Sequence, residues 1–221
     1  TITLPDATGT LLNSDGSGVS LTALNATNLG SGTVPTARLG SGTASSSTVL
    51  YGDQTYKAEP TGGKVLQVIQ THITATSSQS IGSGSTINNI TSLSATITPS
   101  STSSKILVMV RWCGVTAGNR WEQVFGINRG STALGIVTAG NRRAGLATVH
   151  ESNAGWSGSD GMYASSYQYL DSPSTTSATT YYAYVNPEQS GTMYNNRGVN
   201  DTDAGYTERG TSMIIVMEIG A

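Results

Sequence analysis

The chain has 221 residues, with 11 Lys and Arg against 13 Asp and Glu and a formal net charge of −2, so it lacks the basic excess typical of proteins that bind nucleic acid or anionic membranes. Charged residues make up 11% of the sequence, against about 25% in typical soluble proteins, and Gly occurs 27 times, which favours β-structure and tight turns over helices. A single cysteine, Cys113, excludes an intrachain disulfide, and no apolar run approaches the roughly 20 residues of a membrane span.

Residues 1–60 are predicted to form the stem of a fibrous homo-oligomer. The motif LGSG at residues 29–32 recurs at residues 39–42 with Val34-Pro35 between the copies, and Gly and Ser interrupt every helical or strand period. A single chain would leave these spaced Leu and Val side chains in water, whereas several copies wound together would bury them on a shared axis. A flexible Gly/Ser linker is the alternative, although a linker needs neither the Leu repeat nor the Pro.

The boundary of this first part is marked by composition. Residues 49–57, VLYGDQTYK, predict a short aromatic stretch around a Gly-Asp turn, and EPTGG at residues 59–63 reads as a domain boundary. We therefore expect a stem over residues 1–60 and a head over residues 61–221. Because position 1 is Thr rather than Met, we expect the chain to be processed or to be the C-terminal part of a longer protein.

In the head, apolar residues gather into short runs separated by Gly, Pro, Ser and Asn turns, with no helical period. This pattern predicts an all-β fold, an antiparallel β-sandwich of the jelly-roll kind. KILVMVRWC, at residues 105–113, is the longest apolar run and predicts a central strand covered on both faces, with Ile106, Val108 and Val110 on one buried face. The predicted strands are residues 64–76, 87–98, 105–113, 122–128, 132–138, 145–149, 162–170, 179–185, 191–194 and 211–219.

Several of these segments resemble a known family. The first sixty residues, with TLPDATGTLL, LTALNATNLGSGTVPTARLGSG and VLYGDQTYK, resemble the distal stem of tail fibres in tailed bacteriophages. The head resembles a small domain at the C-terminus of such fibres, especially in phages of aquatic bacteria, including cyanobacteria. The matching pieces are GKVLQVIQT at 63–71, ITPSSTSSKILVMV at 97–110, LDSPSTTSATTYYAYV at 170–185 and SMIIVMEI at 212–219, while residues 120–163 depart most from the pattern.

The resemblance implies a homotrimeric fibre end in the virion that attaches the phage to its host. The implied partners are the other copies of the trimer, a host cell-surface glycan, and other phage tail or fibre proteins, with no nucleic acid and no membrane insertion. The alternative is a purely structural fibre or capsid-decoration element that contacts only virion proteins. The family supplies no catalytic motif, so no residue role is carried over from it.

The residues themselves do not predict an enzyme. His72 and His150 are the only histidines, and neither lies near another ligand type at metal spacing. Asp201-x-Asp203 lacks the Gly and the distal Glu of a calcium loop, and its two Asp residues are expected to be solvated and to form a turn. Asp171, before Ser172-Pro173, is expected to be a turn cap. The remaining acids have no spacing that would unite two of them in a glycosidase cleft. We therefore expect no catalytic site, no metal and no cofactor.

Aromatic and Arg residues in the predicted loops are the candidates for receptor binding. Tyr and Trp faces can hold the apolar side of a sugar ring while Arg and Asn donate to its hydroxyls. Trp112 and Tyr167 are expected to be core residues because they sit within strand patterns, and Arg142-Arg143 could equally pair with acids across a subunit interface. The candidate residues are Arg120, Trp121, Arg142, Arg143, Trp156 and Tyr163.

Overall fold

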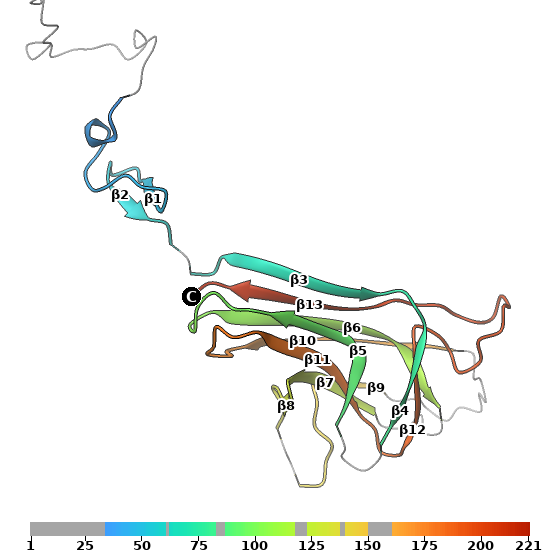
Figure 1. Ribbon diagram of the computed structural model, residues 1–221. Helices are drawn as coiled ribbons and strands as arrows, with labels where there is room; N and C mark the ends of the chain where they lie inside the picture. Colours follow the sequence, from blue (N-terminus) through green and yellow to red (C-terminus); the bar gives the residue numbers. More distant parts are fainter. Residues whose placement is uncertain (1–33, 61, 83–86, 118–122, 138–139, 150–160) are drawn as a thin grey trace, which may run out of the picture. The chain divides into compact units, whose positions relative to one another are not determined.

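The computed structural model describes residues 34–60, 62–82, 87–117, 123–137, 140–149 and 161–221 (Figure 1). The chain divides into two compact units, Thr1–Pro60 and Thr61–Ala221. Strands dominate the described residues of the second unit, as the sequence predicts for an all-β protein, and the described part of the first unit contains two short strands. No helix in the described ranges has the length and apolar character needed to cross a membrane.

The described part of the first unit is built around a short hairpin. A 3₁₀ turn, η2 (Thr36–Arg38), precedes the antiparallel strands β1 (Thr48–Leu50) and β2 (Tyr56–Ala58). Asp53 orders the turn between them, because its carboxylate pairs with Lys57 and accepts hydrogen bonds from the Thr55 backbone and hydroxyl at 3.1 and 2.6 Å, which together lower the Asp53 pKa to about 2. The interchain contacts and the fibrous trimer expected of this unit stay predictions.

The second unit is a β-sandwich of two antiparallel sheets. The first sheet has the order β3-β13-β6-β12-β4, with β10 on the other edge of β6, and the second has the order β5-β11-β7-β8, with β9 also on β7. The strands of the first sheet are β3 (Val65–Ile73), β4 (Ser77–Ile81), β6 (Lys105–Ala117), β10 (Tyr163–Asp171), β12 (Gly191–Asn195) and β13 (Ser212–Ile219). Those of the second sheet are β5 (Asn88–Ile97), β7 (Gln123–Arg129), β8 (Thr132–Ala133), β9 (Ala147–Val149) and β11 (Thr179–Asn186).

The chain alternates between the two sheets as it proceeds. It leaves the first sheet after β4, returns for β6, for β10 and for β12, and visits the second sheet with β5, β7 to β9, and β11. With all pairs antiparallel, this is the connectivity of a jelly roll, a double Greek key. The C-terminal strand β13 lies beside β6 rather than opposite it, with Val216 paired to Val108.

At two places in the sandwich, two consecutive strands pair with the same edge of one neighbouring strand, and the chain leaves the sheet between them. β12 and β13 both pair with the same edge of β6, the first through residues 114–117 and the second through residues 105–111, and residues 197–211 leave the sheet between them. Likewise β8 and β9 both pair with β7, and the chain leaves the sheet between them. We call these segments the 197–211 excursion and the 134–146 excursion.

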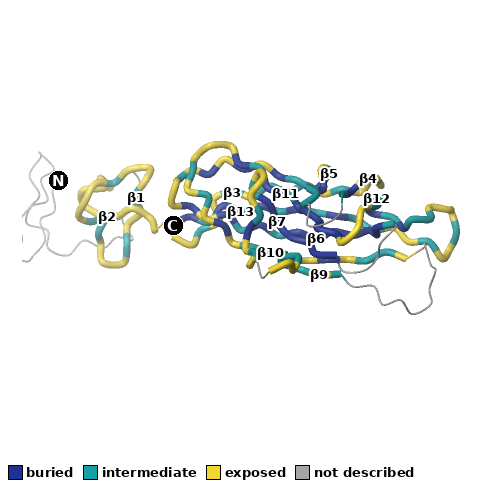
Figure 2. The backbone as a smooth tube through the Cα atoms, turned by 90° about the horizontal axis from the view of Figure 1, so that it is seen from below, coloured by how far each residue is buried: buried dark blue, intermediate teal, exposed yellow. Residues whose placement is uncertain are grey.

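The core lies between the two sheets and is formed by buried residues from strands of both, which Figure 2 marks in dark blue along the backbone. Ile106 and Val108 have no exposed surface and Val110 is 3% exposed, which confirms their predicted place on one buried face. Trp112 and Tyr167 are core residues, as expected, and Cys113 is a buried thiol. The prediction that this strand is covered on both faces is wrong for the single chain, because Leu107 and Met109 point away from the core and are only half-buried.

The strand boundaries also depart from the sequence prediction in two places. Residues 132–138 were expected to form one strand, but β8 ends at Ala133. Gly135 has a φ of +63°, and a Cβ there would lie 2.5 Å from the Tyr169 ring, so the chain turns out of the sheet where a side chain would not fit. β4 was not predicted, because SSQSI carries only one apolar residue to mark a strand.

Asp171, which the sequence predicts to cap a turn, is a buried ion-pair partner. Its carboxylate accepts two hydrogen bonds from Arg129 Nη1 at 2.9 and 3.1 Å and one from the Tyr181 hydroxyl at 2.7 Å. Burial, and then this bond to a carboxylate, raise the pKa of the Tyr181 phenol well above its usual value. The cluster therefore ties the end of β10 to β7 and β11 across the two sheets.

Glu218 on β13 is a second buried carboxylate, and it is fully satisfied by neutral donors. It accepts hydrogen bonds from the Ser100 backbone and hydroxyl at 2.7 and 2.6 Å and from Gln67 Nε2 at 2.6 Å. Burial opposes its ionisation, but the hydrogen bonds outweigh that effect and lower its pKa to about 2. The ionised form thus holds the 98–104 turn against the start of the head.

This arrangement predicts an acid-sensitive contribution to stability from Glu218. Because the folded pKa lies below the unfolded value of 4.5, the contribution is complete above that value and is lost as the pH falls towards about 2. A Glu218→Gln variant turns an amide N–H towards one of these donors, so we expect it to be about 1–3 kcal/mol less stable at neutral pH. The melting temperatures of the two proteins, measured from neutral pH down to about pH 2, should converge as the pH falls. A difference in melting temperature that stays constant over this range would contradict the role of this carboxylate.

Candidate ligand-binding site

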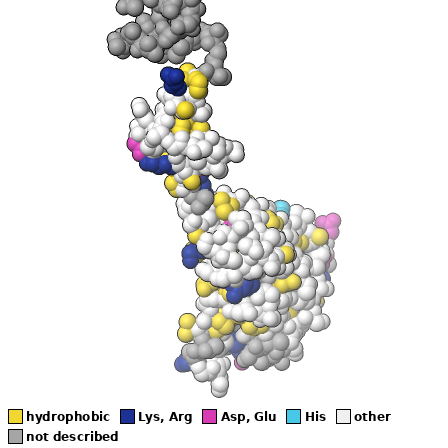
Figure 3. All heavy atoms as spheres, turned by 60° about the vertical axis from the view of Figure 1, so that its left-hand side comes forward, with side chains coloured by type: hydrophobic (Ala, Val, Ile, Leu, Met, Phe, Trp, Pro, Cys, Tyr) yellow, Lys and Arg dark blue, Asp and Glu magenta, His cyan; other side chains and the backbone are white. Residues whose placement is uncertain are grey.

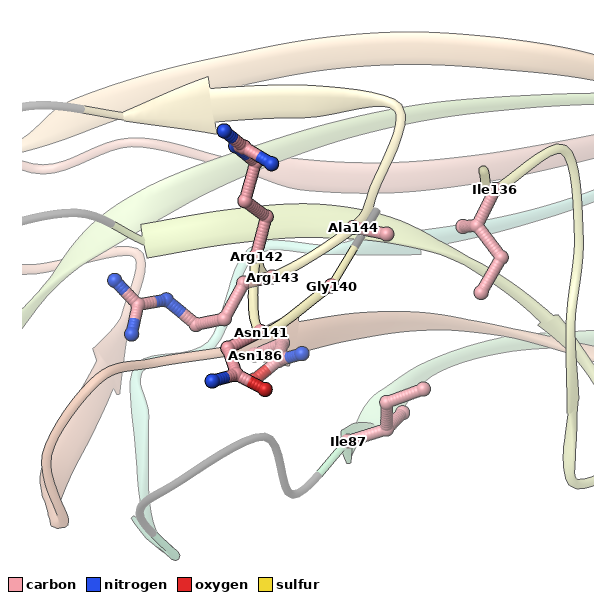
Figure 4. A pocket seen from close by; sticks show the side chains of 8 residues that line it. All are labelled: Ile87, Ile136, Gly140, Asn141, Arg142, Arg143, Ala144 and Asn186. Atoms are coloured by element: carbon pink, nitrogen blue, oxygen red, sulfur yellow. The ribbon is translucent and has the colours of Figure 1, made fainter. Parts of the chain in front are cut away.

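The described surface carries a hollow of about 390 Å³ beside the 134–146 excursion (Figure 4). We call it the loop pocket. Most of its lining residues belong to the 134–146 excursion. Ile87, the residue before β5, and Asn186, the last residue of β11, complete the lining. Its lining residues are Ile87, Ile136, Gly140, Asn141, Arg142, Arg143, Ala144 and Asn186.

The excursion is fixed to the second sheet at several points. Leu134 N donates to Ile127 O at 2.9 Å where the chain leaves β7, and Leu146 N donates to Phe125 O at 2.8 Å where it returns. Between these points the Tyr184 hydroxyl donates to Ala144 O at 3.2 Å. The pocket wall is therefore held by backbone bonds to β7 and by a buried phenol.

Tyr184 reaches the excursion because β7 leaves room for its ring. A Cβ at Gly126 would lie 2.4 Å from the Tyr184 ring, so only Gly admits the ring at this point of the sheet. Burial raises the pKa of the Tyr184 phenol, which keeps the hydroxyl protonated as the donor to Ala144 O. This local packing positions Ala144 and, with it, the arginines that precede it in sequence.

The pocket combines cationic and amide groups with two isoleucines. Asn186 is 5% exposed, and its side-chain oxygen has no hydrogen-bond partner among the residues that the structure describes. A buried acceptor left without a donor costs about 1–3 kcal/mol, so a ligand hydroxyl or N–H that reached it would be bound favourably. Arg143 lies 3.9 Å from Glu188 of the same chain, and no carboxylate lines the pocket within the described ranges. The site therefore suits a polar ligand with acidic or hydroxyl groups.

The structure places three of the six sequence candidates. Arg142 and Arg143 lie together in the pocket wall, and Figure 4 shows their guanidinium groups pointing in different directions from it. Tyr163 begins β10 opposite Gly114 on the first sheet and does not line the pocket. Arg120, Trp121 and Trp156 lie outside the described residues.

Sequence reasoning missed the other polar members of the pocket. Asn186 follows a Tyr-rich strand and Asn141 follows a Gly, and neither position carries a signal beyond a turn. Figure 3 shows few charged side chains in that view, scattered among hydrophobic side chains and the white spheres of other side chains and backbone. Among the described residues no group of three or more His, Cys, Asp and Glu could hold a metal ion.

Comparison with known proteins adds no identification: no family model matches the chain, and no curated protein matches it significantly.

Proposed function

We propose that this chain is the distal part of a bacteriophage tail fibre in the virion, and that its head attaches the phage to a host cell-surface glycan through the loop pocket. The fibre acts as a homotrimer and joins other phage tail or fibre proteins at its proximal side. The observation that carries the binding role is the buried oxygen of Asn186, which has no partner among the described residues and lies in a hollow whose wall holds Arg142 and Arg143. The assignment to a tail fibre rests on the sequence resemblance.

The composition of the pocket favours binding over hydrolysis, and an acidic saccharide over a neutral one. Cleaving a glycosidic bond takes two carboxylates about 5–9.5 Å apart, and the pocket lining offers none. The Arg142 guanidinium would instead pair with the carboxylate of a uronic or similar acidic sugar, while Ile87 and Ile136 would contact the apolar side of the ring. We therefore propose an acidic glycan as the receptor.

Weak sites are sufficient for such a fibre. One sugar in an open hollow gains little over water, and a single-site Kd of about 1 mM is expected. Three linked sites raise the effective concentration, so the avidity of a trimer exceeds single-site affinity by about 10²–10⁴-fold without new contacts. Attachment by this route depends on keeping three pockets open at once.

Replacing Arg142 by Ala is expected to lower binding to acidic saccharides by about 10–100-fold, because a charge-assisted hydrogen bond contributes about 1.5–3 kcal/mol. An array of neutral and acidic saccharides probed with the full chain measures the loss. Arg142→Lys should restore part of it, and binding of the wild-type protein should weaken with added salt.

The matched control is Arg209→Ala, which removes the same charge from an exposed side chain in the 197–211 excursion. It should bind like the wild-type protein. Equal binding by Arg142→Ala and the wild type, with correct folding of both, would remove the loop pocket from the attachment role.

A structural fibre or capsid-decoration element is the second candidate function. One observation favours it: among the described residues, much of the outer face of the first sheet is apolar and only partly buried, as a surface that contacts other protein would be. A full-length trimer that binds no saccharide and no host cell would favour this function over attachment.

A further inference from the structure

The outward-facing side chains of the first sheet form a continuous apolar surface. On β13 the inward and outward residues alternate strictly, and all four outward residues are apolar. The same face of β3 is more exposed, with Val65 and Val68 each 54% exposed, and Leu170 on β10 is 49% exposed. We call this surface the sheet face; it comprises Val65, Leu66, Val68, Leu107, Met109, Leu170, Met213, Ile215, Met217 and Ile219.

The strand register arranges these residues in rows that become less apolar along the sheet. One row, read across four paired strands, is Val68, Met217, Leu107 and Leu170, and all four side chains are apolar. The next row is Gln70, Ile215, Met109 and Gln168, and the one after it is His72, Met213, Arg111 and Ser166. The more apolar part of the face is thus the part nearer the start of β3, and four residues (61–64) separate Pro60 from Val65 in the sequence.

The sheet face is large for a surface in contact with water. Eight residues of β13 extend about 26 Å, and four strands span about 19 Å, which gives roughly 500 Å² in projection. Single chains rarely expose an apolar patch of more than about 300–600 Å², and a stable interface buries about 800 Å² of accessible surface on each side. The whole face, polar rows included, is therefore comparable to the largest apolar patch of an ordinary single chain, and it could form an interface of modest area.

We propose that the sheet face is the contact between heads, so that three copies of this chain turn it towards a common threefold axis. Three sheets of about 19 Å width, set as the sides of a triangle, each lie about 5–6 Å from its centre. Packed sheets lie about 10 Å apart, so one layer of side chains fills about 5 Å on each side. A four-stranded face therefore closes a trimer without leaving a void at the axis.

The cations of the face lie in its outermost rows, Lys105 beside Ile219 at one end and Arg111 and His72 at the other, so the two rows between them carry no charge. Lys105, Arg111 and His72 are the only ionisable side chains that point outward from the paired rows, and no Asp or Glu accompanies them. A surface that binds an acidic partner would be expected to carry its cations near its centre. In the sheet face, however, Arg111 lies in the most polar row, at one end. Three Arg111 side chains would repel one another at the axis, so the heads should separate towards that row.

The first unit supplies a reason for the copies to meet. In its described part Leu39, Val49 and Leu50 are 43–44% exposed, so this unit also presents apolar side chains that a single chain does not cover. If the stems wind together, as proposed above, the heads are tethered at millimolar effective concentration, and an interface of modest area is sufficient. This inference rests on the proposed homotrimer and adds a second, separate contact to it. The loop pocket belongs to the second sheet and its loops, so contact through the sheet face leaves it open.

The test is the accessibility of a thiol placed on the sheet face of the full-length purified protein. Cys113 is buried, so a new cysteine is the main reactive thiol. Val68→Cys should react with a maleimide at least tenfold more slowly than Val137→Cys, although Val68 is 54% exposed and Val137 is 82% exposed in the single chain. In denaturant the two rates should be equal. Light scattering on the same samples gives the number of copies.

Each outcome separates the contact between heads from the proposed function. Trimers in which Val68→Cys is protected support the inference. Trimers in which both thiols react at similar rates overturn it and leave the stem as the only contact between copies. If the protein is a monomer, both the contact between heads and the proposed homotrimer are overturned. This holds even if the Val68→Cys thiol is protected, because in a monomer the protection would have to come from the same chain.

A charged variant gives an independent readout. Met217 points outward and Met217→Glu should keep the folded head, but it brings three carboxylates to the axis. We expect its trimer to dissociate at a protein concentration at least tenfold higher than the wild-type trimer, while saccharide binding per chain is unchanged. Loss of saccharide binding with unchanged dissociation would count against the inference and, separately, against the position of the pocket.

Discussion

Ile106→Asp is expected to yield no folded head. Ile106 has no exposed surface and lies in the core cluster between the sheets, where the substitution would place a carboxylate among apolar side chains. An unpaired buried charge costs several kcal/mol, and the lost packing adds about 2–5 kcal/mol. Single domains have only about 5–15 kcal/mol of stability, so the variant should be unfolded at room temperature. Circular dichroism and the soluble yield measure this directly.

Leu107→Asp is the matched control for that substitution. It makes a comparable change at the adjacent residue, which points out of the sheet and is half-buried. The head should fold, while association between copies weakens because Leu107 belongs to the sheet face. A folded, heat-resistant Ile106→Asp protein would show that the inward and outward faces of β6 have been assigned in the wrong order.

Trp112→Ala is expected to have the second largest effect on stability. The indole is 1% exposed, stacks on Phe125 with ring centroids 4.7 Å apart, and donates from Nε1 to Asn195 Oδ1 at 2.7 Å. Truncation of a buried Trp costs about 3–5 kcal/mol, and it leaves the Asn195 oxygen without its donor. Chemical denaturation with a linear extrapolation should show the whole loss as a lower midpoint with a similar slope.

Trp112→Phe separates the two contributions. It retains most of the ring contact with Phe125 but removes the N–H, so we expect a loss of about 1–3 kcal/mol, smaller than that of the Ala variant. Equal losses for both variants would mean that the hydrogen bond to Asn195, rather than the volume of the ring, decides the stability of this part of the core.

Much of the head could be predicted from its sequence, because strands that face a core on one side repeat their apolar residues with a period of two. The inward positions of β6 and β13 follow directly from that period. The order of strands could not be predicted, since pairing between β6 and β13 joins segments about a hundred residues apart, and local pattern does not encode it. β4 escaped because its five residues pair on an edge and need little apolar character.

The error over residues 105–113 has a physical origin. A continuous apolar run indicates that a strand is buried on both faces, but it does not indicate whether the same chain or another chain covers each face. Leu107 and Met109 read as core because they are apolar, yet within one chain nothing covers them fully. A sequence adapted to an assembly carries the pattern of the assembled state, so this misreading is itself consistent with a contact between copies.

The candidate site was only partly predictable. Arg142 and Arg143 stood out because they follow Gly and Asn in a loop. Asn186 did not, because its importance comes from burial at the end of β11 and from the lack of a partner for its oxygen. Such a property depends on tertiary packing, which one sequence does not reveal.

The two excursions give the head a scaffold with interchangeable parts. Each excursion connects two strands that pair with the same continuous neighbour: β12 and β13 pair with β6, and β8 and β9 pair with β7. The strand register on both sides of each excursion is therefore set without it. The neck of the 197–211 excursion is closed by Gly210 N donating to Asn196 O at 3.2 Å. Doubling the length of such a segment costs only about 0.6 kcal/mol in closure entropy. Segments of different length and sequence can therefore be exchanged at these two places between related chains, while the jelly roll that carries them stays constant.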